Sequence, residues 1–421
     1  MKRLVVFFML LFFSALGSMR HATEAEAGSL SSRGVWVSCF EYGDIGLAGK
    51  SETEFCAAAE QLFSNIRENG CNAVYFHVRS FDDAIYPSSV TGWSKRLLAG
   101  GGAPSYDPLK ILVRISHKYG IKFHAWMNPY RVTMKKTLNP GSQATLDRIV
   151  KQVKEILNRY AVDGIHFDDY FYTSEKKYKK VAKAKRMENV NKMVHEVHKA
   201  VRKKGKVFGI SPAGDISYCE KIGADIKTWM SRKGYVDYIV PQIYWSDDYM
   251  LNGKKTKLFK ERLELWRSLN TRDIPMYVGM AAYKAGEKVT YDRGWKKSNT
   301  NLSRQLRQIR SGNTEGFVLF CYTDLYRTGA QKELRNFLGE LGSLRLNYKK
   351  ITKKKGKSFR LRASSVWPSR LRQKLRYYSK NKKIATVNKK GKVTARKAGK
   401  TRIYVYCGKK KKSCLVRVRS K

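Results

Sequence analysis

Two adjacent carboxylates, Asp168 and Asp169, carry the clearest chemical signal in this 421-residue chain. They end the apolar run that begins at Gly164, and the aromatic residues Tyr170 and Phe171 follow them directly. Such a run is typical of a buried strand that reaches a site at its carboxyl end, which in a β/α barrel is the catalytic rim. Paired carboxyl groups beside aromatic rings suit the hydrolysis of a glycosidic bond. We therefore predict Asp168 and Asp169 as catalytic residues, with Asp168 as the acting carboxylate.

Since successive strand residues face opposite ways, one of these acidic neighbours would act while the other orients a group or binds substrate. A structural role, capping a loop or pairing with a basic neighbour, is the alternative for either residue. A facing carboxylate must then come from another strand end or loop. The sequence does not choose among five candidates, which are Glu41, Asp83, Asp247, Asp248 and Asp324. The separation of the two carboxyl groups, which decides between retention and inversion, also stays open.

Aromatic residues gather at the ends of the predicted strands and in the loops that follow them. Their rings offer surfaces on which apolar sugar faces stack, and nearby amides can bind hydroxyl groups, although any single ring can instead pack in the core. Strand parity places two further polar residues near the same rim. The residues predicted to bind substrate on these grounds are Arg79, Tyr86, Trp126, Asn128, Tyr170, Gln242, Tyr244 and Trp245.

Three histidines, His77, His124 and His166, share this strand parity and would lie one layer below the rim. A hydrogen-bonded polar core layer and a metal site are the two interpretations. We favour the core layer, because nothing in the sequence fixes the mutual distances that metal ligands need. No CxxC or HExxH spacing indicates zinc, and no Gly-rich dinucleotide or phosphate fingerprint follows the first predicted strand. We therefore expect neither a metal ion nor a cofactor.

Short apolar runs alternate with amphipathic segments from Gly34 to about Gly339, which is the rhythm of a parallel sheet with covering helices. Eight repeats favour a (β/α)8 TIM barrel, of the α/β class, expected over residues 33–341. The predicted strands are Gly34–Phe40, Ala73–Arg79, Lys122–Asn128, Gly164–Asp169, Val207–Pro212, Tyr238–Tyr244, Met276–Ala282 and Gly316–Tyr322. The predicted helices are Glu52–Asn69, Asp107–Tyr119, Ser142–Tyr160, Lys176–Lys204, Lys257–Leu269, Asn301–Gly312 and Gln331–Leu341, with a weak connection around Ile222–Lys233.

Residues 1–27 are predicted to form a secretory signal peptide. Met1-Lys2-Arg3 gives a positive start, an apolar stretch follows to Leu16, and Ala25-Glu26-Ala27 is a small-residue cleavage pattern. An uncleaved membrane anchor is the alternative, but the apolar run is shorter than the roughly 20 residues that a spanning helix needs. We expect a secreted protein with no membrane span after cleavage.

The segment from Arg345 to Lys421 contains thirty Lys and Arg residues and no Asp or Glu, so it supplies +30 of the formal charge of +51. Short runs of alternating polar and apolar residues, separated by Gly and Asn turns, predict a small all-β sandwich here rather than a disordered tail. Cys407 and Cys414 bracket a turn between two such runs. A disulfide that closes this hairpin is one interpretation, and two free thiols are the other.

Seven separate motifs, in order between Arg33 and Leu341, are similar to those of glycosyl-hydrolase-like family ten. They are Arg33–Trp36, Arg79 with Asp83–Tyr86, Tyr106–Leu109, His124–Arg131, Asp163–Tyr172, Gly209–Pro212 and Pro241–Trp245. The resemblance implies a TIM barrel outside the cytoplasm and, for members whose role is known, cleavage of peptidoglycan glycan strands. Beside the Asp168-Asp169 motif, it implies as site residues Arg79, Asp83, Asn128, Arg131, Gln242 and Tyr244. The acidic pair Asp247-Asp248 departs from the family pattern.

The basic segment, from about Leu344 to Arg419, resembles a bacterial immunoglobulin-like domain of group two. The motifs that carry this resemblance are Tyr378–Asn381, Ile384–Val387, Gly391–Ala395, Ala398-Gly399 and Thr401–Ile403. It implies an immunoglobulin-like sandwich over residues 345–421 that acts as a surface-adhesion or wall-binding module.

The strongly basic composition, with a sequence pI near 10.1, requires an anionic partner unless the charge merely keeps the protein soluble. The predicted signal peptide argues against nucleic acid and favours anionic wall polymers, reached through the basic domain. We predict a secreted, cell-wall-associated glycoside hydrolase whose substrate is wall glycan, with peptidoglycan strands as the expected polymer. A catalytically silent barrel that only binds wall polymer, and a secreted nucleic-acid binder, are the alternatives.

Overall fold

The computed structural model describes residues 30–173, 176–407 and 410–420, and the predicted signal peptide lies outside them. The described chain divides into two compact units, Leu30–Leu334 and a second one that contains Arg335–Lys421. Within these described ranges, none of the helices combines the length and the apolar character that a bilayer crossing requires.

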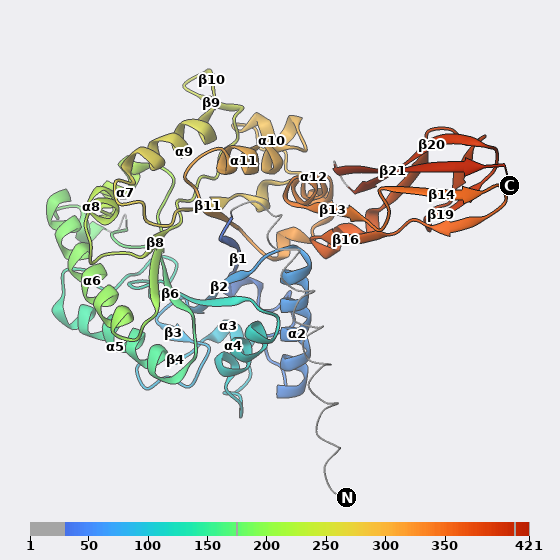
Figure 1. The fold of residues 1–421 in the computed structure, drawn as a ribbon. Helices are drawn as coiled ribbons and strands as arrows, with labels where there is room; N and C mark the ends of the chain where they lie inside the picture. The colour runs from blue at the N-terminus through green and yellow to red at the C-terminus, as the bar shows by residue number, and fades with distance from the viewer. Residues whose placement is uncertain (1–29, 174–175, 408–409, 421) are drawn as a thin grey trace, which may run out of the picture. The chain divides into compact units, whose positions relative to one another are not determined.

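Eight parallel strands of the first unit form a closed barrel (Figure 1). Their order is β11-β12-β1-β2-β5-β6-β7-β8, and parallel bridges from Ile239 to Met276 and from Gln242 to Gly279 join the two ends. Nearly all strand residues are buried, as expected for a parallel sheet that is covered on both faces. The eight predicted strands are confirmed, with the bounds β1 (Ser32–Val37), β2 (Ala73–Arg79), β5 (Lys122–Met127), β6 (Gly164–Asp168), β7 (Val207–Ser211), β8 (Tyr238–Ile239), β11 (Tyr277–Met280) and β12 (Gly316–Leu319).

Helices surround these strands in Figure 1. Ser51 begins α2 with a capping box, because its side chain accepts from the Glu54 N–H while Glu54 reaches back to the Ser51 N–H. The helices are α2 (Glu52–Glu68), α3 (Lys95–Leu98), α4 (Pro108–Lys118), α5 (Gln143–Arg159), α6 (Lys183–Lys203), α7 (Ile216–Lys221), α8 (Ile226–Ser231), α9 (Leu258–Leu269), α10 (Arg293–Lys297), α11 (Asn301–Arg310) and α12 (Gln331–Leu341). Short strand pairs in the loops are β3 (Asp83–Ala84) with β4 (Gly92–Trp93) and β9 (Tyr249–Leu251) with β10 (Lys254–Thr256).

The helix predicted to begin at Lys176 begins instead at Lys183, after the 3₁₀ helix η2 (Lys176–Tyr178). The reason is the aromatic residue at the end of η2. Tyr178 is buried, and its hydroxyl lies 3.0 Å from the Thr137 hydroxyl, which holds the chain against the loop after β5. The weak fifth connection forms two short helices, α7 and α8, in place of one long helix.

Polar rings fill the middle of the barrel. The Tyr238 hydroxyl hydrogen-bonds to His124 Nδ1 at 2.9 Å and to His166 Nδ1 at 3.2 Å. The Tyr75 ring packs against both histidines, with ring centroids 4.8 and 4.7 Å away. Gly209 makes this packing feasible, because a Cβ there would lie 2.3 Å from the Tyr238 ring. The predicted polar core layer is therefore confirmed for His124 and His166.

The second unit is a small all-β sandwich, as predicted. One sheet has the order β14-β21-β20-β17, another has the order β15-β19-β18, and β13 pairs with β16. Buried residues alternate with exposed ones along β20, where Ile403 and Val405 face inward. The strands are β13 (Ser343–Leu346), β14 (Lys350–Lys354), β15 (Ser358–Arg360), β16 (Ala363–Trp367), β17 (Arg376–Ser379), β18 (Ala385–Val387), β19 (Lys392–Ala395), β20 (Gly399–Cys407) and β21 (Lys410–Arg419).

Cys407 and Cys414 are both buried free thiols, so the disulfide interpretation is wrong. The register of the β20–β21 hairpin explains why. Cys407 pairs with Lys410, whereas Cys414 pairs with Ile403, which lies four residues before Cys407 on β20. Because a disulfide needs Cα atoms within about 7 Å of each other, this register keeps the two sulfur atoms apart.

Candidate functional site

Asp168 and Asp169 lie where β6 ends, at the carboxyl rim of the barrel. Asp168 is 7% exposed, and its Oδ1 accepts hydrogen bonds from Gln242 Nε2 at 3.0 Å and from the Asp169 N–H at 2.9 Å. Asp169 Oδ2 accepts the Ala213 N–H at 2.8 Å, just after β7. Backbone and amide donors thus fix the orientation of both carboxyl groups.

The two carboxyl groups have raised and unequal pKa values. Burial raises the pKa of Asp168 to about 6, although the positive charge of Arg131 lowers it. Burial and the adjacent charge of Asp168 raise the pKa of Asp169 well above its ordinary value. Because both pKa values are raised and the two groups titrate together, the pair can hold a proton at a higher pH than ordinary aspartates do. A proton donor beside a carboxylate is the combination that glycoside hydrolysis requires.

A row of alternating aromatic rings and arginines, which we name the rim ladder, runs along the rim to Asp168. It consists of Phe40, Arg96, Phe81, Arg131 and Tyr170. The Arg96 guanidinium carbon lies 4.2 Å from the centre of the Phe40 ring and 5.7 Å from that of Phe81. The Arg131 carbon lies 5.0 Å from the Phe81 centre and 3.8 Å from the Tyr170 centre. These contacts hold both cations by cation–π attraction.

The two arginines of the rim ladder differ from Arg79, a buried arginine at the same rim, in their acidic partners. Arg79 forms an ion pair with Asp82 at 2.8 Å. Arg131 is only 8% exposed and Arg96 is exposed, yet neither lies within ion-pair distance of a carboxylate among the described residues. A buried guanidinium without a paired carboxylate is costly unless a ligand supplies the anion. The rim ladder is therefore suited to a substrate that carries negative charge.

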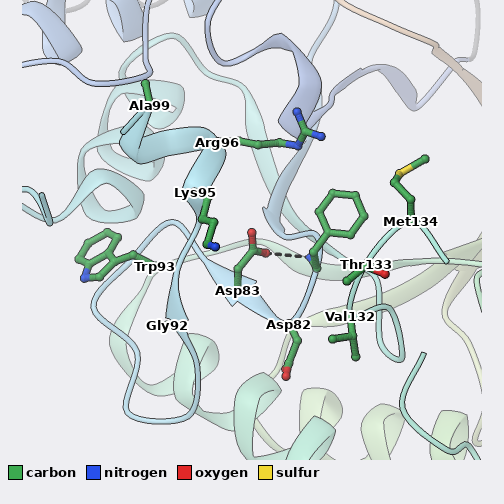
Figure 2. Close-up of a pocket in the computed structure, with 11 residues that line it drawn as sticks. Asp82, Asp83, Gly92, Trp93, Lys95, Arg96, Ala99, Val132, Thr133 and Met134 are labelled. Atoms are coloured by element: carbon green, nitrogen blue, oxygen red, sulfur yellow. Dashed lines mark hydrogen bonds between the residues drawn. The ribbon is translucent and has the colours of Figure 1, made fainter. Parts of the chain in front are cut away.

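Two hollows flank Arg131 and Tyr170 on the rim. The larger, of about 740 Å³, lies between the loops after β2 and β5, and Figure 2 shows Lys95 and Arg96 extending into it from α3. The smaller, of about 440 Å³, includes Asp169, Tyr170 and Tyr218 in its wall. Met134 lines both hollows. Through Asp169, the carboxyl pair thus adjoins the smaller hollow.

Arg79 and Asn128 hold the rim in shape from below. The buried Arg79 guanidinium donates to the carbonyl oxygens of Asn128 and Pro129, which joins the end of β2 to the end of β5. Asn128 Nδ2 in turn donates to the Ser80 carbonyl at 3.1 Å. Both residues were predicted to bind substrate, but these contacts make them positioning residues for the loops that carry Phe81 and Arg131.

The aromatic residues predicted to bind sugar differ in how far the structure exposes them at the site. Tyr170 is 39% exposed at the site, and the Tyr244 ring is near enough to Asp168 that this charge, after burial, raises the pKa of Tyr244. Trp126 is buried and its ring stacks on His77 with centroids 3.7 Å apart, so it forms the floor. Tyr86 is 1% exposed and packs against Tyr160. A fully buried ring leaves no face for a sugar, so Tyr86 is a packing residue.

Trp245 lies beside the site on the segment that follows β8. It is half-buried, and a Cβ at Gly214 would lie 2.5 Å from its ring, so the ring covers the chain after β7. Gln242, three residues earlier, connects that chain to the carboxyl pair, because its Nε2 also donates to the Ser211 carbonyl at 2.8 Å. The structure therefore places Gln242 at the site, in direct contact with Asp168.

The five candidates for a facing carboxylate all accept hydrogen bonds or form ion pairs, and one of them, Asp83, also lines the larger hollow. Glu41 accepts the backbone N–H groups of Ser38 at 2.6 Å and Thr323 at 2.7 Å. Asp247 accepts the Lys260 N–H at 2.9 Å. The remaining contacts are Asp83 with Ser80 and Phe81, Asp248 with Lys255, and Asp324 with Cys321 and Arg327. Within the described residues, Asp168 and Asp169 are thus the pair best placed to react.

The rim histidine, His77, accepts the Cys39 N–H at Nδ1, 3.4 Å away. Burial lowers the pKa of His77 and His166 well below the ordinary value and that of His124 to about 4, so all three rings are neutral near pH 7. Among the residues that the structure describes, no group of three or more His, Cys, Asp or Glu side chains is arranged to hold a metal ion.

Sequence reasoning missed Arg96 and Tyr218, which line the two hollows. Both lie on short helices, α3 and α7, that the alternating pattern of strands and long helices does not reveal. The available signal for Arg96 was the aromatic residue Phe81 at the end of the preceding strand, since exposed aromatic rings attract guanidinium groups.

Sequence comparison supports the same assignment as the geometry. Residues 31–145 and 135–297 match the family described as Glycosyl hydrolase-like 10, which together is more than half of the chain. The chain belongs to glycosyl hydrolase-like family 10. Residues 342–416 match the bacterial Ig-like domain of group 2. Both resemblances seen in the sequence are thereby confirmed, and the barrel is that of a glycoside hydrolase family.

Curated relatives of this family 10 chain carry the same name. Glycosyl hydrolase DigH of Escherichia coli (strain K12) is 29% identical over 355 residues, which cover 66% of this chain and 79% of DigH. Glycosyl hydrolase YngK of Bacillus subtilis (strain 168) is 28% identical over 317 residues. That match spans 59% of this chain and 61% of YngK, so the activity of the whole relative is a proposal for this chain.

Solved structures similar to this family 10 chain confirm its barrel fold. The glycoside hydrolase domain of PgaB (BpsB) from Bordetella bronchiseptica has a TM-score of 0.52 at 10% identity, covering 73% of this chain and 98% of that domain. Catalytic domain 2 of the group II chitinase from Ostrinia furnacalis has a TM-score of 0.52 at 10% identity, covering 74% and 96%. At this identity the likeness extends to the fold alone.

Proposed function

We propose that this protein is a secreted glycoside hydrolase that cleaves glycan strands of the bacterial cell wall. The observation that carries the proposal is the buried carboxyl pair, Asp168 and Asp169, held by Gln242 and by the Ala213 N–H at the rim of a glycosyl hydrolase-family barrel. Protonated Asp169 donates its proton to the oxygen of the scissile bond, while ionised Asp168 stabilises the positive charge that develops on the sugar. Water then adds to that sugar carbon and passes a proton to the Asp169 carboxylate, which restores the acid and leaves a new reducing end.

The substrate class follows from the charge at the rim. Arg96 and Arg131 lie along the rim without a paired carboxylate among the described residues, and aromatic rings alternate with them. Peptidoglycan strands combine sugar rings with carboxylates, which lie on the peptide stems or, where a stem has been removed, on the lactyl ethers, so they offer both complements. The signal peptide pattern in residues 1–27 and the basic domain support a location at the wall.

Digestion of purified peptidoglycan tests this proposal. The full-length protein is incubated with intact peptidoglycan and with peptidoglycan from which an amidase has removed the peptide stems, and the products are separated and weighed by mass spectrometry. We expect glycan fragments with new reducing ends from at least one of the two, and none from the Asp168→Asn variant. A preference for one polymer then shows whether the protein recognises free lactyl carboxylates or peptide stems. Absence of new reducing ends from both polymers contradicts the proposal.

A catalytically silent barrel that binds wall polymer is the second candidate. The observation that favours it is the engagement of every facing carboxylate candidate in hydrogen bonds or ion pairs within the described residues. The two candidates differ in a simple readout. A silent barrel sediments with purified sacculi and releases no reducing ends, whereas the hydrolase does both.

The Arg131 charge predicts a shift in the pH profile. Because this charge lowers the pKa of Asp168, its removal in Arg131→Gln should raise that pKa. Activity requires ionised Asp168 and falls as the pH drops through about 6, so the acidic limb of kcat/KM should move to higher pH. Arg131→Lys, which keeps the charge, is the control. An unchanged acidic limb in Arg131→Gln would mean that Asp168 does not set it.

A further inference from the structure

The basic domain carries one sheet face on which tyrosines and cations are interleaved. Along β17, β20 and β21, buried residues such as Ser379, Ile403 and Cys414 alternate with outward residues that are half-buried or exposed. The outward set includes Tyr378, Arg402, Tyr404, Tyr406 and Lys411, which we name the tyrosine–cation face. Strand register sets its pattern, because Tyr378 pairs with Tyr404 and Tyr406 pairs with Lys411.

The members of the tyrosine–cation face contact one another directly. The rings of Tyr378 and Tyr404 are nearly parallel, with an interplanar angle of 21° and centroids 6.5 Å apart. Lys411 Nζ lies 4.0 Å from the centre of the Tyr404 ring and 5.6 Å from that of Tyr406. These contacts position the rings and the charge together, and the outer ring, Tyr378, remains 52% exposed. Exposed rings held beside fixed cations can recognise a ligand by its shape, which evenly spread surface charge cannot do.

A hollow adjoins this face. Its volume is about 450 Å³, and its walls include Lys349, Lys412, Ser364 and Ser413. Ser413 lies on β21 opposite Tyr404, and its hydroxyl accepts a hydrogen bond from Arg402 at 3.1 Å, so the hollow continues directly into the tyrosine–cation face. The domain contains no Asp or Glu to neutralise these cations. The surface therefore combines a concavity, hydroxyl groups, aromatic rings and unopposed positive charge.

We infer that the tyrosine–cation face and the adjoining hollow form a binding site for anionic glycan strands, separate from the catalytic rim. Sugar rings stack on Tyr378 and Tyr404, and the acidic groups of the strand meet Arg402 and Lys411. This inference rests on the proposed function, since the polymer is the one that the barrel cleaves. The polymer is a polysaccharide rather than a nucleic acid because the same chain carries a glycosyl hydrolase-family barrel.

Charge-matched variants of the full-length protein test the site against purified sacculi in a sedimentation assay. Tyr404→Ala changes no charge, and we expect it to weaken binding at least fivefold. Arg402→Ala with Lys411→Ala removes two charges from the face, whereas Lys389→Ala with Lys390→Ala removes two from an exposed turn after β18. We expect the first pair to weaken binding at least tenfold more than the second. Tyr378→Ala, at an exposed ring, gives the same test with little risk to folding.

Equal losses from the two charge pairs, with normal binding by both tyrosine variants, would overturn the site and leave only a diffuse field. Tighter binding to single-stranded DNA than to glycan at 0.15 M salt would assign the face to nucleic acid and would also overturn the inference. Turnover of short soluble glycan fragments by the same preparations separates the two proposals. Lost sacculus binding with intact turnover confirms the site and the hydrolase together, while absent turnover with face-dependent binding refutes the hydrolase alone.

Discussion

Asp168→Asn is expected to reduce glycan cleavage by roughly 10²- to 10⁴-fold while the protein remains folded. The asparagine oxygen still accepts the hydrogen bonds that Gln242 Nε2 and the Asp169 N–H donate to Oδ1, so the geometry of the rim is kept. What is lost is the negative charge that stabilises the oxocarbenium-like transition state. The loss should therefore appear in kcat more than in KM, measured as reducing ends released per unit time.

The same substitution should make the protein more stable at neutral pH. Burial raises the pKa of Asp168 from 3.8 to about 6, so the stability contributed by its neutral form is present below about pH 4 and is lost as the pH rises through 6. The wild type thus bears a penalty of the order of 1 to 3 kcal/mol at pH 7 that the asparagine avoids. We expect Asp168→Asn to melt a few degrees higher at pH 7, with the difference closing near pH 4. If the variant and the wild type have equal melting temperatures at pH 7 and equal turnover, Asp168 is not a catalytic residue.

The barrel could be predicted from the sequence because each of its strands has a recognisable local pattern of apolar residues. Parallel strands are buried on both faces, so each of the eight appears as an apolar run, and the one that ends in Asp168 and Asp169 marks the rim. Gln242 could be placed near them because strand ends meet at one edge of a barrel. The 3.0 Å contact between Gln242 and Asp168 could not be predicted from the sequence, since it depends on the bridges that close the barrel.

Loops set the limit of such prediction. Tyr86 was placed at the rim by its distance from β2 along the chain, but the loop folds back and packs this ring against Tyr160 at the end of α5. The guanidinium carbons of Arg131 and Arg96 lie 5.0 and 5.7 Å from the centre of the same Phe81 ring, although the two residues come from different segments of the chain. No sequence period relates these positions, so their meeting is visible only in three dimensions.

The buried Lys284–Asp292 pair shows how the segment after β8 is held. Asp292 is fully buried and accepts hydrogen bonds from the Ser246 N–H at 3.1 Å, from the Ser246 hydroxyl, and from Trp295 Nε1 at 3.0 Å. Lys284 Nζ lies 3.6 Å from the Asp292 carboxylate and donates to the Tyr244 carbonyl at 2.6 Å. The network thereby anchors the chain that presents Tyr244 beside Asp168.

Asp292→Ala should destabilise the barrel by about 3 to 5 kcal/mol, the usual cost of removing one partner from a buried ion pair. The substitution leaves three buried donors without an acceptor and isolates the Lys284 charge, which burial already disfavours by lowering its pKa. Chemical denaturation gives the free energy, and turnover by the folded fraction should also fall because Tyr244 is no longer fixed. Asp292→Asn keeps an acceptor oxygen and should lose less. If Asp292→Ala unfolds at the wild-type denaturant concentration with normal turnover, this network neither stabilises the barrel nor positions its site.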